Sequence, residues 1–486
     1  MKILLKSENK LKYFLFPLIS IYFSLFPFIS AYSQSDSLMF YLALAAKNNP
    51  TVLQRFTEYQ ASLQKVPQVG SLPDPDINVG VFLQPMELIS GNQVADIRLM
   101  QMFPWFGVLK NARDEMSLMA KARFESFRDA KLQVFYDVQR TWYDLYKTDQ
   151  DIRISEKNIQ ILKTIERLAL VRYKTSLGGS GVSSSPMNSA GAAKSQGSSG
   201  GSSGMQIMGG SSGNNQQANT NNPPPAMGSS SSSVGLTLAD LYRIQIEIGD
   251  LENNVALLGN QQSTIISRFN SYLNRPVQSS VAVIDTLKPD TLNVSLHAAS
   301  DSMLGNNPML GMLQFEQQSL DARKKMVSRM GYPMVGLGVN YTLINKSEMS
   351  TSPMNGKDMI MPMVTVTLPI YRKKYKAMKT ETSLMKTATE QNYTATANSL
   401  QTEYYEASKL FQDAQRRITL YENQSQLAKK SLDILTKSFS VSGSGLTDIL
   451  RIRQQTLDYE FKQVEAVVDY NTAISWLKRL MAFYQL

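Results

Sequence analysis

The chain has 486 residues, of which 43% are hydrophobic, and it carries a formal net charge of +10. It has no cysteine, which excludes disulfide frameworks and thiolate zinc sites, and its one histidine, His297, disfavours histidine-based acid–base catalysis. The basic residues form no patch interleaved with aromatic residues, so the sequence gives no indication of nucleic-acid binding.

Residues 1–33 are predicted to be a secretory signal peptide. Lysines near the start precede an apolar run over residues 14–31, and Ala31-Tyr32-Ser33 provides a small-x-small cleavage site. The alternative is one transmembrane helix, which Pro17 and Pro27 within the run disfavour. No later segment has 18 consecutive apolar residues, so a mature membrane protein would have to be a barrel.

Two parts of the sequence repeat each other, and residues 34–276 and 277–486 are predicted to be the two repeats. Asn48-Asn49-Pro50 recurs as Asn306-Asn307-Pro308 at an offset of 258 residues. The other correspondences are Pro75 with Pro333, Phe103-Pro104 with Leu368-Pro369 at an offset of 265, Gly235-Leu236-Thr237 with Gly445-Leu446-Thr447, and Asp240, Arg243 and Ile244 with Asp448, Arg451 and Ile452 at an offset of 208.

The first repeat is predicted to carry an insertion. The offset falls from 265 to 208, so the first repeat has about 57 extra residues, which the 58-residue tract 177–234 accounts for. Half of this tract is Gly or Ser, and Lys194 is its only charged residue. Because such a composition cannot bury enough apolar surface to offset the entropy of ordering, we expect the tract to be disordered.

Each repeat is predicted to contain one very long helix and a partner helix. Residues 108–176 and 372–442 contain neither Gly nor Pro, show apolar residues at three- and four-residue spacing, and would each extend roughly 100 Å as helix. Helices of this length are typical of coiled coils. The partner helices are predicted over residues 237–274 and 446–484.

Two β-hairpins are predicted, over residues 76–103 and 334–370. The alternating apolar residues are Ile77, Val79, Val81, Leu83, Ile97, Leu99, Val335, Leu337, Val339, Tyr341, Leu343, Val364, Val366 and Leu368. This alternation is typical of barrel strands with one face toward lipid and the other toward a wet lumen, although two half-buried hairpins would show it too. Because four strands cannot close a transmembrane barrel, several chains would have to share one.

The order of elements in each repeat is helix, strand, loop, strand, very long helix, glycine turn and long helix. Together with Leu72-Pro73-Asp74-Pro75 and Gln101-Met102-Phe103-Pro104-Trp105-Phe106-Gly107, this order resembles the TolC-like outer membrane efflux family. The resemblance covers about residues 37–486 except the insertion. The two quoted segments are also similar to the heavy-metal (copper/silver) branch of that family.

The resemblance implies a mainly α fold with a small β part. Three chains would form a hollow α-barrel across the periplasm and a shared twelve-stranded β-barrel in the outer membrane of a diderm bacterium. The protein would be a passive exit duct of a tripartite efflux system and not an enzyme, with no cofactor. Its partners would be a periplasmic adaptor, an inner-membrane pump and outer-membrane lipid. The alternative function is a structural coiled-coil protein of the envelope without transport activity.

The resemblance also implies that the periplasmic end is closed by helix tips with acidic residues close after the tip turn. Asp240 and Asp448 match these positions, and a ring of aspartates would favour cations by charge. Arg451, with its counterpart Arg243, departs from the family's pattern and could instead form Asp–Arg pairs that hold the gate shut. A third possibility is that the aspartates stabilise helix N-termini.

The chain contains 25 methionines. Met187, Met205, Met208 and Met227 lie in the insertion, and Met349, Met354, Met359, Met361 and Met363 lie in or beside the second hairpin loop. Thioethers are soft ligands that suit Cu(I). One hypothesis is therefore that the insertion gathers soft metal ions at the periplasmic tip, near the pump entrance. For the methionines of the folded parts, the alternative is adaptable apolar packing.

Overall fold

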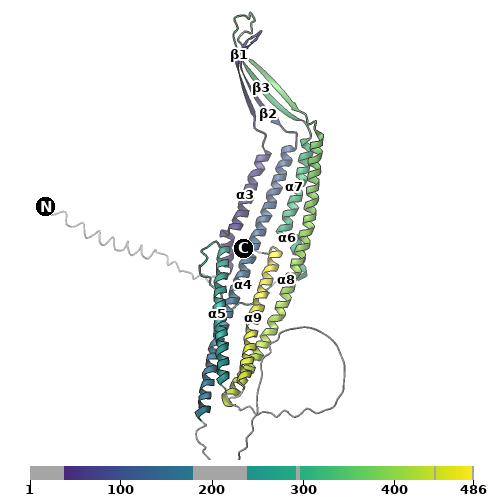
Figure 1. The fold of residues 1–486 in the computed structure, drawn as a ribbon. Coiled ribbons are helices and arrows are strands. Elements are labelled where there is room, and N and C mark those ends of the chain that lie inside the picture. Colours follow the sequence, from purple (N-terminus) through teal and green to yellow (C-terminus); the bar gives the residue numbers. More distant parts are fainter. Residues whose placement is uncertain (1–37, 179–237, 292–295, 443–444, 484–486) are drawn as a thin grey trace, which may run out of the picture. The chain divides into compact units, whose positions relative to one another are not determined.

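The computed structural model of the chain describes residues 38–178, 238–291, 296–442 and 445–483. They form long helices and one small antiparallel sheet (Figure 1), so the predicted class, mainly α with a small β part, is confirmed. The predicted signal peptide lies outside the described residues, and so does the predicted insertion except for its first two residues.

The described elements follow the predicted order, except that two helices precede each hairpin where one was expected, because Asn49-Pro50 and Asn307-Pro308 start a new helix. The helices are α2 (Leu38–Asn48), α3 (Pro50–Gly70), α4 (Val108–Gly178), α5 (Leu238–Tyr272), α6 (Leu296–Asn306), α7 (Pro308–Met330), α8 (Arg372–Ser442) and α9 (Leu446–Leu480). The strands are β1 (Asp76–Leu88), β2 (Gly91–Phe103), β3 (Met334–Asn345) and β4 (Met359–Thr367).

Asn49 and Asn307 begin α3 and α7 in the same way. Each side-chain oxygen accepts a hydrogen bond of 2.9 Å from the backbone N–H two residues later, and each is followed by proline at the first helical position. An asparagine cap satisfies an otherwise unpaired N–H, and proline has no N–H to lose there. Each amide also donates to the last carbonyl of a distant helix, Asn49 to Tyr272 (2.8 Å) and Asn307 to Leu480 (3.0 Å).

The two longest helices have 71 residues each. Helix α8 has the predicted bounds, and α4 continues to Gly178, two residues beyond its predicted end. Their sequences contain no internal proline or glycine that would break the hydrogen-bond ladder, so each extends for about 105 Å if straight. None of the described helices contains an apolar stretch long enough to cross a bilayer.

The partner helices end earlier than predicted, α5 by two residues and α9 by four. Beyond each end, one residue has left-handed backbone, Asn274 (φ 52°) and Ala482 (φ 54°). The next N–H then bonds back across the last turn, from Arg275 to the Asn270 carbonyl and from Phe483 to the Lys478 carbonyl. This arrangement stops the helix while satisfying its last carbonyls.

The four strands form one antiparallel sheet in the order β1-β2-β3-β4. Leu88 pairs with Gly91, so the first hairpin closes with a two-residue turn, and Gly91 has a φ of 120° that favours glycine. The second hairpin ends at Thr367, three residues before its predicted end. The central pairing of β2 with β3 begins at Phe103 and Val335, so it joins the two hairpins to each other.

The chain divides into two compact units. Of the described residues, the first comprises 38–155, 253–291, 296–426 and 457–483, and the second comprises 156–178, 238–252, 427–442 and 445–456. Helices α4, α5, α8 and α9 each contribute residues to both units. The units therefore do not coincide with the predicted repeats, because each unit contains segments of both.

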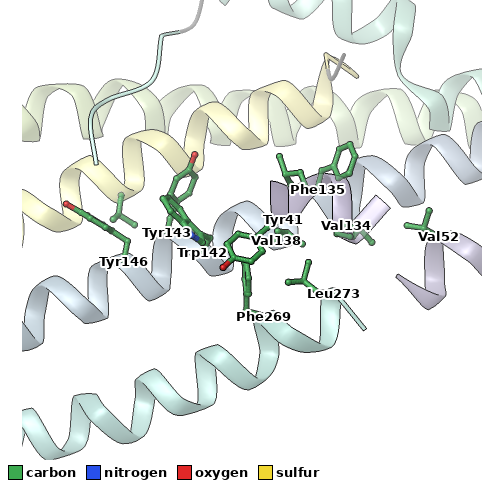
Figure 2. Close-up of a cluster of buried hydrophobic side chains, with 13 residues drawn as sticks. Tyr41, Val52, Val134, Phe135, Val138, Trp142, Tyr143, Tyr146, Phe269 and Leu273 are labelled. Atoms are coloured by element: carbon green, nitrogen blue, oxygen red, sulfur yellow. The ribbon is translucent and has the colours of Figure 1, made fainter. Parts of the chain in front are cut away.

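One hydrophobic core of the first unit lies where α2 packs against α4, α5 and α9 (Figure 2). Trp142 is at its centre and 2% exposed, and the rings of Tyr41 and Phe269 meet edge to face at 5.0 Å. The core residues are Tyr41, Leu42, Ala45, Val52, Val134, Phe135, Val138, Trp142, Tyr143, Tyr146, Phe269, Leu273 and Val468.

A second core of the same unit lies among α6, α7, α8 and α9, and its residues are Met303, Leu310, Leu400, Tyr404, Ala407, Leu477, Leu480 and Met481. Several of them stand at the repeat offsets from residues of the first core. Ala45 and Met303 are 258 residues apart, and Trp142 and Ala407 are 265 apart. Corresponding positions of the two repeats therefore contribute different side chains to the two cores.

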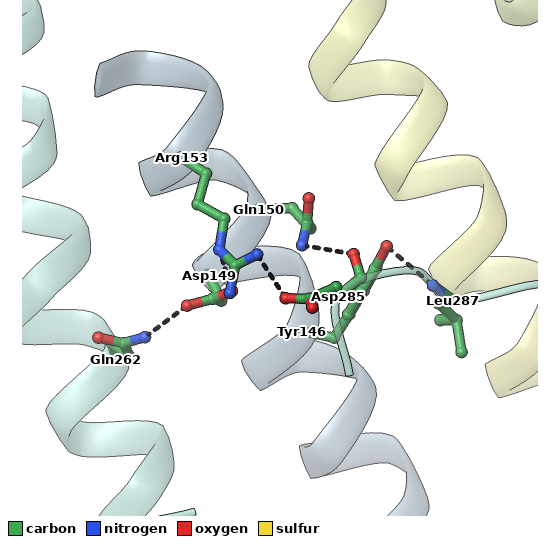
Figure 3. Close-up of polar contacts among 7 residues, drawn as sticks. All are labelled: Tyr146, Asp149, Gln150, Arg153, Gln262, Asp285 and Leu287. Atoms are coloured by element: carbon green, nitrogen blue, oxygen red, sulfur yellow. Dashed lines mark hydrogen bonds and ion pairs between the residues drawn. The ribbon is translucent and has the colours of Figure 1, made fainter. Parts of the chain in front are cut away.

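Residues 273–291, which follow α5 at the boundary between the two predicted repeats, are attached to α4 by polar contacts (Figure 3). The Asp285 carboxylate pairs with Arg153 (2.8 Å), and its backbone carbonyl accepts from Gln150 (3.2 Å). The Leu287 N–H donates to the Tyr146 hydroxyl at 3.1 Å. The connection therefore adopts a defined path across α4 without forming a helix or strand of its own.

Candidate functional site

The four gate candidates predicted from the sequence lie in the second compact unit, near the starts of α5 and α9. Asp240 and Asp448 both lie in the first helical turn. Gly445, with a φ of 92°, directly precedes α9, and this left-handed backbone conformation favours glycine. Carboxylates in the first turn favour helix formation because they face the positive end of the helix dipole.

The structure joins Asp448 and Arg451, as predicted. The Arg451 guanidinium lies 3.0 Å from the Asp448 carboxylate, and both side chains are exposed. The pair lies within one helical turn of α9, and exposed pairs of this kind contribute only about 0.3–0.5 kcal/mol. Arg243 occupies the corresponding position three residues after Asp240 and is exposed. The Asp448–Arg451 pair by itself is too weak to hold a gate shut.

Other contacts hold the helices of the second unit together. The Arg172 side chain of α4 donates to the Ser440 carbonyl of α8 and lies over the Phe439 ring at 5.9 Å. Between α4 and α5, Lys163 pairs with Glu252, and Gln245 donates to Glu166, both at 2.8 Å.

Arg453 of α9 is buried in the second unit, only 6% exposed. Sequence reasoning did not single it out, because it selected charged residues by their distance from the tip turn. The signal that could have identified Arg453 is its position four residues after Ile449 and three after Leu450, both of which are buried, so that all three fall on one side of α9.

The predicted metal ligands of the insertion, Met187, Met205, Met208 and Met227, lie outside the described residues. Within the described ranges, no group of three or more His, Cys, Asp or Glu side chains could hold a metal ion.

The sheet has one apolar and one mixed face, as its alternation predicts. Cross-strand pairs place Val79 opposite Ile97, and Leu337 between Gln101 and Val364, on the same face. Most of the apolar residues on this face are exposed, with Val364 at 69%. Such a continuous apolar surface is unusual for a soluble domain and indicates contact with another protein or with lipid.

Aromatic residues surround the base of the sheet, where the strands meet α4 and α7. The rings of Trp105 and Tyr332 stack at 5.3 Å, and Phe106 is 84% exposed. Trp105 and Phe106 border a largely apolar cavity of about 540 Å³, which is lined by Leu72, Phe103, Pro104, Trp105, Phe106, Gly107, Leu109, Pro333, Val335 and Leu337. Exposed aromatic rings at the end of an apolar surface are typical of a membrane–water boundary.

Three aspartates, Asp137, Asp144 and Asp151, lie seven residues apart along α4, in the first unit. Burial raises the pKa of each carboxyl. For Asp151 burial raises the pKa to about 6, Lys147 partly opposes this rise, and Glu465 adds to it. The charged form of Asp151 is therefore disfavoured in the folded chain.

Asp151→Asn is expected to stabilise the protein at pH 7.5 and to leave its stability at pH 4 nearly unchanged. Above pH 6 the unfolded chain loses the Asp151 proton readily, while the folded chain bears the cost of the buried charge. The difference between a pKa of 3.8 and one of about 6 corresponds to at most about 3 kcal/mol. Because Asp151 is only partly buried, we expect a gain of about 1–2 kcal/mol.

The measurement is the midpoint of thermal unfolding of the purified protein at both pH values. Asp458→Asn, which alters an exposed carboxylate paired with Lys462 at 2.7 Å, is the control and should give no gain. Equal gains for Asp151→Asn at pH 4 and pH 7.5 would show that its charge is not the cause.

No protein-family model matches the chain, and no curated protein matches its sequence. Solved structures do match. They include the outer membrane protein VceC from Vibrio cholerae (TM-score 0.66, 11% identity, 91% of this chain and 95% of that chain). The outer membrane channel CmeC from Campylobacter jejuni matches with a TM-score of 0.64 at 13% identity, over 91% and 85% of the two chains. The open outer membrane channel MtrE from Neisseria gonorrhoeae matches with 0.65 at 11%, over 91% and 88%.

The chain therefore has the fold of the TolC-like outer membrane efflux channels, as its sequence predicts. The match spans nearly the whole of each chain at low identity, so it establishes the path of the backbone. The chemistry of the sheet faces and helix tips has to be argued from this chain's own residues.

Proposed function

We propose that this protein is an outer-membrane channel subunit of a tripartite efflux system. It is a passive exit duct, which performs no bond chemistry, for substrates that an inner-membrane pump and a periplasmic adaptor deliver. The observation that carries the proposal is the exposed apolar face of the sheet, bounded by aromatic residues, in a chain with the fold of outer membrane channels. Outer-membrane lipid covers this face, and the helices extend into the periplasm.

The functional unit is a homotrimer. In the described sheet, β1 and β4 are the outer strands, and each pairs with one neighbour only. Unpaired strand edges are not tolerated in a bilayer, because their backbone polar groups would lack hydrogen bonds. Three chains with four strands each form a closed twelve-stranded barrel in which these edges pair with one another, and the helices form the hollow α-barrel.

The chain consists of a signal peptide (residues 1–33), two repeats (residues 34–276 and 277–486) and an insertion (residues 177–234) in the first repeat. The matching asparagine caps and the two cores at the repeat offsets support the division into repeats. Since α4 leads into the insertion and α5 follows it, the insertion belongs to the helix tips of the second unit.

Asp240 and Asp448 contribute to an acidic ring at the helix tips, with Arg243 and Arg451 modulating its charge. The double variant Asp240→Asn/Asp448→Asn is expected to reduce the permeability ratio of K⁺ to Cl⁻ several-fold, because three chains lose six carboxylates at one constriction. The measurement is the reversal potential of the channel in a planar bilayer with a KCl gradient.

Asp433→Asn, which alters an exposed carboxylate of α8 paired with Lys437, is the matched control. If selectivity stays unchanged in the double variant while its thermal stability falls, the aspartates only stabilise the starts of their helices.

The cargo includes heavy-metal cations, and the insertion methionines Met187, Met205, Met208 and Met227 collect them near the pump entrance. The support is chemical: thioethers bind soft cations such as Cu(I), and these four methionines lie in a tract too polar to form a core. Deleting residues 178–233 should then lower copper tolerance, and an unchanged tolerance would contradict a role of the insertion.

Growth of a strain lacking the gene tests the function as a whole. The strain and its complemented parent are compared in graded copper, silver, zinc, detergent and hydrophobic antibiotics. A selective loss of copper and silver tolerance supports metal export, whereas loss confined to organic compounds makes the protein a drug or detergent duct. No loss for any compound, together with the absence of heat-modifiable trimers from outer-membrane fractions, favours a structural coiled-coil protein instead.

A further inference from the structure

Basic residues are concentrated at the start of α8, beside the base of the sheet (Figure 1). The first eight residues of this helix contain no acidic residue and five basic ones, Arg372, Lys373, Lys374, Lys376 and Lys379. All five side chains are exposed, and none of them forms an ion pair with another residue that the structure describes. The start of α8 therefore presents five positive charges to its surroundings.

Helix formation does not require these cations. Positive charge near the start of a helix faces the positive end of the helix dipole and is unfavourable there. The corresponding helix of the first repeat, α4, begins with balanced charges, since its first eight residues include Lys110, Arg113, Asp114 and Glu115. An anionic partner outside the described residues would offset the unfavourable charge of α8.

Three of the cations form a stripe along α8. Lys376 and Lys379 follow Arg372 at distances of four and seven residues, so the three side chains fall on one side of the helix. Arg372 also lines a cavity of about 650 Å³ together with Leu368 and Ile370. These two residues continue the apolar alternation of β4 and are 64% and 73% exposed. The stripe therefore begins where the apolar face of the sheet ends.

Lys374 marks the other side of the helix. It follows Arg372 by two residues, which places it on nearly the opposite side of α8. Lys374 lines a different cavity, of about 360 Å³, together with Met334 and Thr367. These two residues pair with each other on the mixed face of the sheet. The side of α8 with Arg372 thus continues the apolar face, and the side with Lys374 continues the mixed face.

The neighbourhood of the stripe is typical of a membrane–water boundary. Tyr371, which directly precedes Arg372, is exposed, and tyrosine concentrates where acyl chains give way to headgroups. Clusters of about four to eight Lys or Arg residues beside a bilayer bind anionic headgroups, and each cation strengthens binding about fivefold. The cluster at the start of α8 has this size and lies next to an apolar surface.

We propose that the stripe of Arg372, Lys376 and Lys379 binds the headgroup of an anionic phospholipid. The acyl chains of the lipid lie against Leu368 and Ile370, and its phosphate pairs with the Arg372 guanidinium at the edge of their shared cavity. The inference rests on the proposed function, in which the apolar face contacts lipid, and it adds the class of lipid and the residues that select it.

A second copy of the chain is the other candidate partner. Asp74 and Asp76 are exposed at the start of β1, at the same end of the sheet. Two carboxylates would leave most of the five cations without a partner, and they would not cover the exposed Leu368 and Ile370. A phospholipid supplies both an anion and acyl chains, so it accounts for the charge and for the apolar residues beside it.

The test compares three variants of the full-length protein with the wild type. Arg372→Gln/Lys376→Gln/Lys379→Gln removes the charge of the stripe, and Arg372→Lys/Lys376→Arg/Lys379→Arg keeps it. The matched control removes equal charge from exposed positions of the second unit, by Lys157→Gln/Arg167→Gln/Lys430→Gln. Each protein is titrated in nonionic detergent with phosphatidylglycerol or phosphatidylcholine, and thermophoresis measures the two affinities.

We expect the charge-removing variant to bind phosphatidylglycerol at least tenfold more weakly than the wild type, since three cations together contribute roughly a hundredfold. The charge-keeping variant and the control should stay within about twofold of the wild type, because the stripe keeps its charge in both. Phosphatidylcholine, which has no net charge, should bind all four proteins equally.

Equal phosphatidylglycerol affinity of the wild type and the charge-removing variant would overturn the proposal, provided that circular dichroism shows both equally folded. An equal loss in the control would also overturn it, because overall charge would then be the cause. Asp74→Asn/Asp76→Asn tests the second copy. If this variant and the charge-removing variant both lose the trimer on unheated gels without lipid, the stripe binds another chain and the proposal fails.

The K⁺ conductance of the wild type and the charge-removing variant in phosphatidylcholine bilayers tests the proposed function separately. Channels without a difference in phosphatidylglycerol affinity refute only the lipid site. A difference in phosphatidylglycerol affinity without channels keeps the lipid site and refutes the duct.

Discussion

Val364→Arg is expected to prevent the protein from entering lipid bilayers, whereas Thr365→Arg is expected to leave insertion intact. The two residues are neighbours on β4 but belong to opposite faces of the sheet. Val364 is paired with Leu337 on the apolar face, and Thr365 is paired with Gly336 on the mixed face. An arginine facing lipid costs about 2–4 kcal/mol at the bilayer midplane and less toward the interfaces, and the proposed trimer would incur the cost three times.

Flotation of reconstituted liposomes measures insertion, and planar-bilayer recordings measure the channels that form. Circular dichroism of both variants in detergent ensures that a loss of insertion does not reflect a loss of folding. If the two variants insert equally well, the apolar face does not contact lipid. This result would contradict the proposal that the protein is an outer-membrane channel.

Trp142→Ala is expected to destabilise the first unit by about 3–5 kcal/mol, the cost of removing a large buried aromatic side chain. Trp142 is almost fully buried where α2 packs against α4 and α5, and its ring meets that of Tyr143 at 5.6 Å. The indole nitrogen is buried without a hydrogen-bond partner among the described residues, so Trp142→Phe should cost well under half as much.

The measurement is chemical unfolding in detergent followed by circular dichroism. Phe106→Ala, which removes an exposed ring at the base of the sheet, is the control and should leave the unfolding midpoint unchanged. Equal effects of Trp142→Ala and Trp142→Phe would show that the lost volume does not determine the cost.

The long helices and the two faces of the sheet could be predicted because their signals are local. Helix α8 has the bounds expected from a stretch without Gly or Pro, and alternation assigned residues such as Val364 to the correct face. The ends of α5 and α9 were missed because each helix ends at left-handed backbone, at Asn274 and at Ala482, where the sequence has no glycine to indicate it.

Contacts between distant parts of the chain could not be predicted. The attachment of Asp285 to Arg153 depends on where the connection crosses α4, which no periodicity encodes. The burial of Arg453 was missed because a single charged residue in an amphipathic helix is normally exposed. The packing of the Met102 side chain over Gly336, where an added Cβ atom would lie 2.5 Å from the Met102 Sδ, depends on the register between β2 and β3, and a shift of one residue would remove it.

The central strand pairing also has a consequence for biogenesis. Phe103 and Val335, which pair between β2 and β3, are 232 residues apart in the sequence. At synthesis rates of about 5–20 residues per second, the first hairpin is complete roughly 10–50 s before its partner strand exists. During this interval an apolar hairpin has no neighbour on either edge and is prone to aggregate. The newly made chain should therefore depend on a holding chaperone until its second hairpin emerges.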